Sequence, residues 1–210
     1  MTIHTEVLSP VQQDILLDLG KFATEQGFYL GGDTATALYL GHRHSIDYDW
    51  FSLDKIDDPL ALAEKARLSG LDIENVQVSP GMLHSSIHGI QISFFEYLYK
   101  PIANFTFWLD FSINLASLDD LACMKLAAIA QRGSRKDFID IHSIALHYKP
   151  LHDLLELYRR KYSTDDITHI LIGLTYFDDA EEEPSPIMLH EISWDEIKRQ
   201  FQEWTKGLAG

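Results

Sequence analysis

The chain has 210 residues, which is enough for one large domain or for two small ones that share an interface. Hydrophobic residues make up 46% of it and charged residues 23%, a globular composition that excludes a mainly disordered chain. The formal net charge of −15 counts against a large nucleic-acid-binding surface, because Lys and Arg supply most of the affinity for a polyanion. No apolar run approaches the ~18 residues of a membrane span and the first residues lack the features of a signal peptide, so we expect a cytoplasmic protein with no membrane partner.

Helical and extended patterns alternate in the first half of the chain. A helix is expected to begin after Ser9, an N-cap residue that is followed by Pro10 and by an apolar stripe at helical spacing. The further elements expected in this half are a strand at 28–30, a helix at 34–40, a strand at 46–51, a helix at 59–68 and strands at 72–78, 82–87 and 90–98. His88 and Gly89 form the expected hairpin turn between the last two strands.

The pattern becomes helical from Ser117 onward. The change near Leu115 predicts an α+β domain with flanking helices over 1–115, followed by a helical domain over 116–210. Cys123, the single cysteine, lies among apolar residues and is expected to be a small buried side chain. The helices expected in this half cover 118–131, 135–147, 151–161, 164–176 and 194–207, with an acidic loop at 178–186 between the last two.

Two carboxylates are expected side by side on the strand at 46–51. Alternation along a strand places Ile46, Tyr48 and Trp50 on one face, and it places Asp47, Asp49 and Phe51 on the other. Hard oxygen ligands on one face suit Mg²⁺, which takes one or two carboxylates and completes its octahedron with water and phosphate oxygens. Asp47 and Asp49 are therefore the candidate metal ligands.

A glycine pair stands just upstream, at a predicted strand-to-helix junction. Gly31 and Gly32 would let the backbone approach a phosphate group closely, and the following helix offers free N–H groups and the positive end of its dipole. Two glycines in a turn are weak evidence alone. Together with Asp47 and Asp49 on the next strand, they predict a site for a metal-bound nucleoside triphosphate.

The order Gly-Gly, helix, Asp-x-Asp is similar to the signature of polymerase-β-like nucleotidyltransferases. More specifically, two segments resemble the two motifs of the AbiEii/AbiGii toxin family, and together they span most of residues 28–141. The first comprises Tyr29-Leu30-Gly31-Gly32 and Ala37-Leu38-Tyr39-Leu40-Gly41-His42-Arg43-His44-Ser45-Ile46-Asp47-Tyr48-Asp49-Trp50-Phe51. The second comprises Leu118-Asp119-Asp120-Leu121-Ala122-Cys123-Met124-Lys125-Leu126-Ala127-Ala128-Ile129-Ala130 and Arg132-Gly133-Ser134-Arg135-Lys136-Asp137-Phe138-Ile139-Asp140-Ile141.

The resemblance implies a polymerase-β-like nucleotidyltransferase domain, with a mixed sheet and flanking helices, and a helical C-terminal domain that completes the active-site cleft. It also implies a Mg²⁺-dependent transfer of a nucleotidyl group from a nucleoside triphosphate to an acceptor, with release of pyrophosphate. It implies that Asp47, Asp49, Lys125 and Asp137 are catalytic. The residues expected to bind the nucleotide are Gly31, Gly32, Arg43 and Lys125. For Arg43, an exposed surface arginine is an equal alternative.

The position of Lys125 on its expected helix is informative apart from the family resemblance. On a helix it shares a face with apolar residues, so its ammonium group emerges from an apolar stripe and needs an anion. It could extend to solvent along its own methylenes or pair with a carboxylate. Asp137 and Asp140 on the next predicted helix favour a phosphate-contacting lysine that an acidic partner orients.

Two features depart from the expected pattern. Glu96 is the one nearby candidate for the third carboxylate that many enzymes of this fold use to activate the acceptor hydroxyl, but a place on the solvent face of its strand is the favoured alternative. Asp33 follows the glycines where the family commonly has a small or hydroxylated residue. A carboxylate beside a phosphate site is unfavourable unless it points away or caps the helix.

Alternative functions follow from the same residues. Family members are typically toxins with a cognate antitoxin, which implies an antitoxin partner and an RNA acceptor such as tRNA, whereas the charge of −15 suits a protein hydroxyl or a small molecule better. The fold could also serve as a catalytically weak or inactive module that binds nucleotide or a protein partner. The pairs His42 with His44 and His84 with His88 have spacings that a transition metal could use, but the first pair flanks Arg43 in an expected turn and the second falls on strands or a hairpin without an accompanying acidic ligand.

Overall fold

The computed structural model describes residues 2–207. Its centre is one seven-stranded sheet in the order β3-β4-β5-β2-β1-β7-β6. The sheet is mixed, because β2 runs parallel to β5 and β1 runs parallel to β7, whereas the other neighbours are antiparallel. The strands are β1 (Phe28–Leu30), β2 (Asp47–Ser52), β3 (Glu74–Ser79), β4 (Met82–Ile87), β5 (Ile90–Glu96), β6 (Thr106–Trp108) and β7 (Ile113–Leu115).

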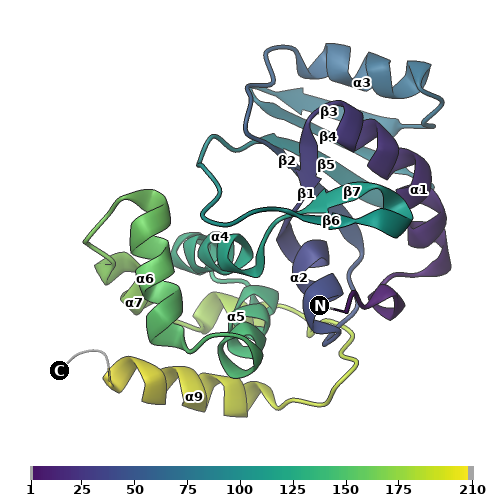
Figure 1. Ribbon diagram of the computed structural model, residues 1–210. Coiled ribbons are helices and arrows are strands. Elements are labelled where there is room, and N and C mark those ends of the chain that lie inside the picture. The colour runs from purple at the N-terminus through teal and green to yellow at the C-terminus, as the bar shows by residue number, and fades with distance from the viewer. Residues whose placement is uncertain (1, 208–210) are drawn as a thin grey trace.

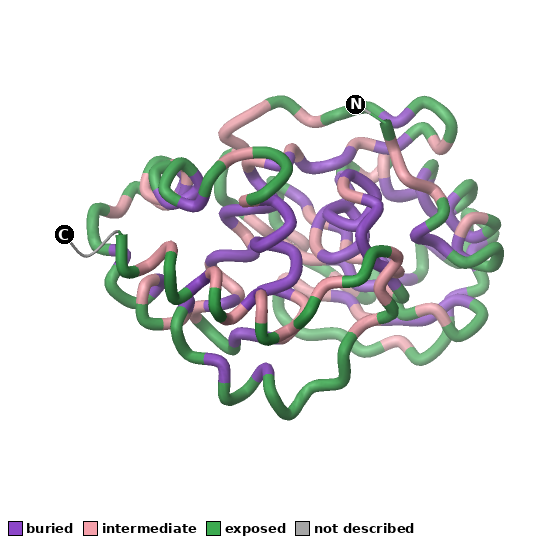
Figure 2. The backbone as a smooth tube through the Cα atoms, turned by 90° about the horizontal axis from the view of Figure 1, so that it is seen from below, coloured by how far each residue is buried: buried purple, intermediate pink, exposed green. Residues whose placement is uncertain are grey.

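Helices surround the sheet and extend to one side of it. Figure 1 shows α1 and α3 in the half of the molecule that holds the sheet, α4 to α9 in the other half, and α2 between the two. Buried backbone runs through both halves in Figure 2. The helices are α1 (Pro10–Glu25), α2 (Gly32–Leu40), α3 (Pro59–Leu68), α4 (Leu118–Gln131), α5 (Arg135–His147), α6 (Leu151–Tyr162), α7 (Thr168–Gly173), α8 (Asp178–Glu182) and α9 (Trp194–Lys206), with the 3-10 turns η1 (Thr5–Val7) and η2 (Leu109–Phe111).

Local signals in the sequence fix several of these boundaries. The Ser9 hydroxyl accepts a hydrogen bond from the backbone N–H of Gln12, whose side chain accepts from Ser9 in return, so a capping box starts α1. Gly41 ends α2 in the left-handed region, at φ 62°. The expected helices at 59–68, 118–131 and 135–147 and the strand at 82–87 are confirmed with the expected bounds. The mixed sheet with flanking helices confirms the predicted α+β fold.

The two faces of β2 have different surroundings. Tyr48 and Trp50 are fully buried on one face, where Trp50 stacks on Phe94 of β5 and the Tyr48 hydroxyl donates to the carbonyl of Gln12, at 2.9 Å. Asp47 and Asp49 lie on the opposite face and are half-buried. The aromatic face anchors β2 in the core, whereas Asp49 on the acidic face lines a cavity together with Lys125 of α4.

Three expectations at the level of elements are wrong, and one hairpin was not expected. Ile46, expected on the buried face of the strand, is 75% exposed, because β2 begins only at Asp47. The helix expected at 164–176 is confined to α7, and the acidic loop contains the short helix α8. The hairpin of β6 and β7 was not expected, since its strands have three residues each and are too short to give a clear alternation.

Within the described part of the chain, no helix combines the length and apolar character needed to cross a membrane.

Candidate active site

Asp47 and Asp49 are held on β2 between two neighbouring strands. On β5 the residues paired with them are Gln91 and Ser93, which carry no charge. On the other side, the backbone N–H of Gly31 donates to the carbonyl of Asp49, at 2.9 Å, and ties the end of β1 to β2. The two carboxylates therefore project from adjacent positions of one strand face, beside the glycine pair.

Burial and neighbouring negative charges raise the pKa of both carboxylates. Burial, together with the neighbouring charges of Asp47 and Asp33, raises the pKa of Asp49 to about 7. Burial and the charge of Asp33 also raise the pKa of Asp47. Lys136 and Lys125 act in the opposite direction at both carboxylates without cancelling the rise at either. A pair of carboxylates in this condition gains from a bound cation.

The donor set fits Mg²⁺. Among residues 2–207, no group of three or more His, Cys, Asp or Glu side chains is arranged to hold a metal ion. The chain thus offers two hard oxygen donors at this position rather than a closed cage, which is the way Mg²⁺ is commonly bound when a substrate supplies phosphate oxygens.

Close contacts with side chains of β2 leave no room for a Cβ atom at Gly31 or Gly32. A Cβ on Gly32 would lie 2.7 Å from Oδ2 of Asp49, and the φ of Gly32 is +61°, a region that other residues rarely adopt. A Cβ on Gly31 would lie 2.6 Å from the ring of Phe51. The two glycines therefore let the Asp49 carboxylate and the Phe51 ring pack directly against the turn that leads into α2.

Lys125 is fully buried within a cluster of carboxylates. Its Nζ donates to Oδ1 of Asp137 at 2.8 Å, lies 2.8 Å from Oδ2 of Asp140 and also pairs with Asp33. Burial opposes the positive charge, but Asp140, Asp33 and Asp137 outweigh it and hold the pKa of Lys125 above its ordinary value. The structure thus brings Lys125 and Asp137 into contact and gives the lysine three anionic partners.

Arg43 is engaged by Asp140. Its Nε and Nη2 donate to the two oxygens of Asp140, each at 2.7 Å, and Nε2 of His42 lies 2.8 Å from the same carboxylate. Nη2 of Arg43 is also 3.5 Å from Oδ1 of Asp33. Arg43 is buried, and most of its donor groups are used within the protein, so the structure places it in the wall of the site.

Two cavities meet at this cluster. The first has a volume of about 260 Å³ and is lined by Gly32, Asp33, Asp49, Phe51, Tyr97, Met124, Lys125, Ala127, Ala128, Gln131, Arg132, Lys136, Asp137 and Tyr162. The second has a volume of about 530 Å³ and is lined by Asp33, Arg43, His44, Ser45, Ile46, Asp47, Lys136, Glu183, Pro184, Ser185, Pro186 and Ile187. Asp49 faces one cavity and Asp47 faces the other.

The wall of the second cavity is built from two distant parts of the sequence. The N–H of His44 donates to the carbonyl of Ile187, at 2.9 Å, and the N–H of Leu189 donates to the carbonyl of His42, at 2.9 Å. These bonds attach the segment after α8 to the loop that precedes β2. They also place the exposed side chains of Ile46 and Ile187 beside the same opening.

Several residues of the site were missed by sequence reasoning. Lys136 lines both cavities, and its position directly before Asp137 in the second motif was the one available signal. Tyr97 and Tyr162 line the first cavity, with their hydroxyl oxygens 2.6 Å apart. No sequence pattern links these two tyrosines, because they come from the segment after β5 and from the end of α6.

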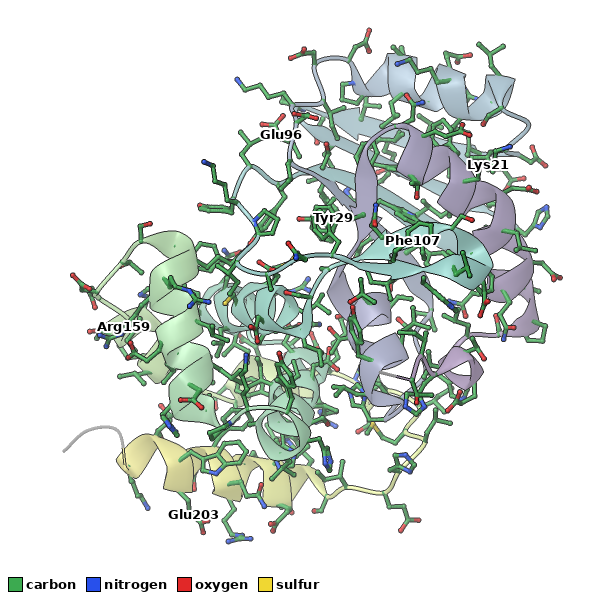
Figure 3. All side chains as sticks on the ribbon, viewed as in Figure 1. Lys21, Tyr29, Glu96, Phe107, Arg159 and Glu203 are labelled. Atoms are coloured by element: carbon green, nitrogen blue, oxygen red, sulfur yellow. The ribbon has the colours of Figure 1, made fainter. Side chains whose placement is uncertain are left out.

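Glu96 lies away from the two cavities, whereas Asp33 lines both of them. Glu96 lies at the far end of β5, opposite Ser52, where its carboxylate accepts from the N–H of Ile56 at 3.2 Å and packs on Gly81 (Figure 3). It lines neither cavity. The Asp33 side chain, by contrast, is buried at the start of α2 and pairs with Lys125 and Lys136.

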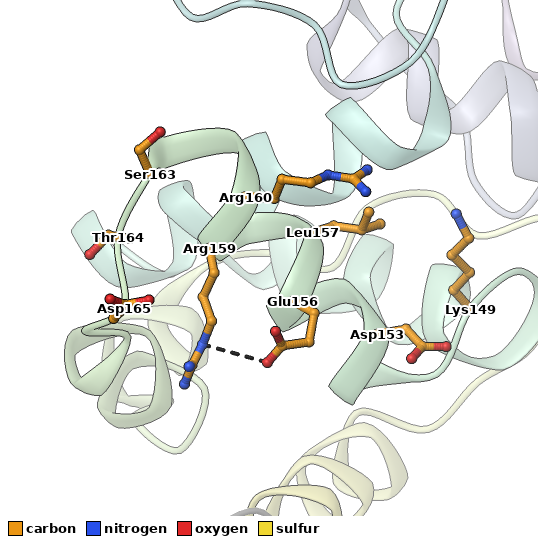
Figure 4. Close-up of a pocket in the computed structure, with 9 residues that line it drawn as sticks. All are labelled: Lys149, Asp153, Glu156, Leu157, Arg159, Arg160, Ser163, Thr164 and Asp165. Carbon is orange, nitrogen blue, oxygen red and sulfur yellow. Dashed lines mark ion pairs between the residues drawn. The ribbon is translucent and has the colours of Figure 1, made fainter.

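A further cavity, of about 750 Å³, lies along α6 and the turn that follows it (Figure 4). Its charges are of both signs, and Arg159 lies 3.6 Å from Glu156 within it. None of the residues implied by the two motifs lines this cavity.

Cys123 is outside all of these sites and is fully buried, which raises the pKa of its thiol to about 12 and confirms its role as a small core side chain.

The comparison with protein families decides the classification. Residues 14–206 match the model of the nucleotidyl transferase AbiEii toxin family, which is described as a type IV toxin–antitoxin system. The chain belongs to the AbiEii family. It is accordingly a nucleotidyltransferase that uses nucleoside triphosphates, as the resemblance of the two motifs predicted.

The related proteins align with nearly the whole length of this chain. The protein aq_aa25 of Aquifex aeolicus is 37% identical over 202 residues, which is 95% of this chain and 96% of that protein. JHP933 from Helicobacter pylori has a similar structure, with a TM-score of 0.57, 16% identity and coverage of 96% of this chain and 95% of that one. The nucleotidyltransferase toxin MenT4 from Mycobacterium tuberculosis aligns with a TM-score of 0.55 and 14% identity over 93% of this chain and 82% of that one. These structural similarities confirm the fold.

Replacing Lys125 tests the carboxylate cluster. In Lys125→Met, Asp137 loses its close cation, whereas Asp140 keeps Arg43 and Asp33 keeps Lys136, and breaking a buried pair by removing one partner typically costs about 3–5 kcal/mol. We expect a loss of this order in the free energy of unfolding, measured with urea. Lys149→Met is the matched control, because Lys149 pairs with Asp119 at the surface, where such pairs contribute little. Equal stability of the two variants would contradict the proposed role of the cluster.

Replacing Asp49 tests the carboxylate pair. Because its folded-state pKa is raised, ionised Asp49 destabilises the folded protein, and this effect grows between about pH 4 and pH 7 and is complete above pH 7. The charges that act on it are those of Asp47, Asp33, Lys136 and Lys125. In EDTA at pH 8, Asp49→Asn should therefore melt at a higher temperature than the wild type, and at pH 4 the difference should vanish. A lower melting temperature at pH 8 would show that the carboxylate is a structural group.

Proposed function

We propose that this protein transfers a nucleoside monophosphate from a Mg²⁺-bound nucleoside triphosphate to an acceptor hydroxyl and releases pyrophosphate. The observation that carries the proposal is the pair of half-buried carboxylates, with raised pKa values, beside a glycine turn in a chain of a nucleotidyltransferase family. Asp47 and Asp49 hold the metal. On these two carboxylates a bound Mg²⁺ would supply Lewis-acid chemistry, that is, positive charge against the negative charge that develops on the transferring group.

The nucleotide is assigned to the first cavity. Gly31 and Gly32 bring the backbone at the start of α2 close to the phosphates, and Asp49 faces the same space. Phe51, Tyr97 and Tyr162 provide aromatic surface on which a base can stack. Asp137 orients Lys125 near the phosphates, and Arg43 stabilises the wall through Asp140.

The acceptor is assigned to the second cavity, next to Asp47. In-line displacement requires the attacking oxygen and the leaving group on opposite sides of the phosphorus, and two cavities that share Asp33 and Lys136 in their linings provide separate spaces for the nucleotide and the acceptor. The acceptor oxygen bonds to the α-phosphorus while the bond to the bridging oxygen breaks. Pyrophosphate leaves with the electron pair, and the hydroxyl proton is lost to solvent. The acceptor is an RNA, such as a tRNA, or a protein.

The biological role follows from the family. AbiEii proteins are described as toxins of a type IV toxin–antitoxin system, and we assign this chain the toxin role, with a cognate antitoxin as partner and the cytoplasm as its compartment. We propose that residues 1–115 form an α+β domain and residues 116–210 form a helical domain. Residues of both parts line the first cavity, since Asp49 comes from β2 and Lys125 comes from α4.

One observation favours a second function. The residues opposite Asp47 and Asp49 on β5 are Gln91 and Ser93, and Glu96 is directed elsewhere, so the sheet supplies no third carboxylate to activate an acceptor. A module that only binds a nucleotide, or that binds a protein partner, would not need a third carboxylate. Transfer is preferred because of the family to which the chain belongs.

Transfer is tested with purified protein, Mg²⁺ and each of the four α-labelled triphosphates, in the presence of total RNA or a cell lysate. We expect label in RNA or in a protein, and we expect neither labelling nor Mg²⁺-dependent triphosphate binding with Asp49→Asn. Calorimetric binding without any transfer by the wild type would select the binding module. Absence of both binding and transfer would refute the proposal.

A further inference from the structure

Lys136 lies at the junction of the two cavities. It and Asp33 are the two residues that line both of them. If the nucleotide enters one cavity and the acceptor the other, the phosphorus under attack lies where the cavities meet. The side chains at this junction are therefore the ones that face the reacting phosphate.

The two lysines of the site differ in how firmly they are held. The side chain of Lys125 is 5% exposed and keeps Asp137 and Asp140 as partners even without Asp33. The side chain of Lys136 is 34% exposed and is paired with Asp33. Lys136 is therefore free to exchange its partner for a substrate anion, whereas Lys125 is fixed in the cluster.

Asp33 stands where an anion is expected. It is the second residue of α2, at the positive end of the helix dipole and directly after the glycine pair. Its carboxylate pairs with Lys125 and Lys136 and lies 3.5 Å from Nη2 of Arg43. Helix N-termini and clustered cations are the usual environment of a bound phosphate, and in this chain a carboxylate fills it.

We propose that the triphosphate replaces the Asp33 carboxylate as the partner of Lys136, so that Lys136 contacts the phosphate under attack and Asp33 holds this lysine in the nucleotide-free protein. This inference rests on the proposed transfer function and assigns a phosphate-contacting residue to the same site. Lys136 keeps its proton throughout. Its charge acts on the negative charge that develops during transfer, which is where a cation has most effect on the rate.

The exchange has a consequence for affinity. Asp33 competes with the triphosphate for Lys136, and its own negative charge repels the phosphates. The carboxylate thus lowers the affinity for triphosphate below the value that the same cations would give without it. Asp33→Asn removes the competing charge but preserves the size of the side chain, and it leaves Lys125 with Asp137 and Asp140.

The test compares Lys136→Met with Lys149→Met. Lys149 has a similarly exposed side chain, 33%, and a single carboxylate partner, Asp119, but it lines neither cavity of the cluster. We expect Lys136→Met to lower kcat/KM for transfer by about 100-fold or more, the usual effect of removing one transition-state donor. It should weaken binding of Mg²⁺-triphosphate but not of the free nucleoside. Lys149→Met should match the wild type in both measurements, and Lys136→Arg should recover part of the activity.

Asp33→Asn provides the second arm. We expect it to tighten binding of Mg²⁺-triphosphate about tenfold, measured by calorimetry, with no change in binding of the nucleoside. If Lys136→Met transfers as well as Lys149→Met, or if Asp33→Asn binds triphosphate no better than the wild type, the exchange is refuted and the transfer function stands. If the wild type neither binds triphosphate nor transfers a nucleotide, the transfer function itself is refuted.

Discussion

Asp140 is fully buried, and its carboxylate accepts two hydrogen bonds from Arg43 while lying 2.8 Å from Nζ of Lys125. A buried charge is tolerated only when its partners are in place, so this contact fixes three elements relative to one another. Asp140 comes from α5, Lys125 from α4 and Arg43 from the loop before β2. The position of the acidic strand relative to the helical half of the molecule depends on this contact.

Charge is distributed unevenly around the contact. Lys125 and Arg43 are neutralised within the protein by Asp137, Asp140 and Asp33. The carboxylates of β2 receive only partial compensation, which leaves a local excess of negative charge in a half-buried place. The folded protein therefore retains electrostatic repulsion at this position, which is the cost to stability that a site for a cation would carry before the cation binds.

The sequence predicted those features that depend on neighbouring residues. The capping box at Ser9, the alternation of Tyr48 and Trp50 with the carboxylates and the need of Lys125 for an anion were all local signals. Ile46 was misassigned because the backbone before it pairs with distant segments, as in the bond from the N–H of Ser45 to the carbonyl of Val7. The pairing of Asp33 with lysines about a hundred positions later depends on how α4 and α5 pack on α2, which no local pattern reveals.

Arg135 supports the second cavity from outside it. This residue begins α5 and lines neither cavity of the cluster, but its backbone N–H donates to the carboxylate of Glu183 and its Nη1 donates to the hydroxyl of Ser185, each at 2.9 Å. The segment after α8 that lines the second cavity is thus attached to α5 by side chains and to the loop before β2 by backbone bonds. A displacement of α5 would therefore change the width of this cavity without altering any residue that lines it.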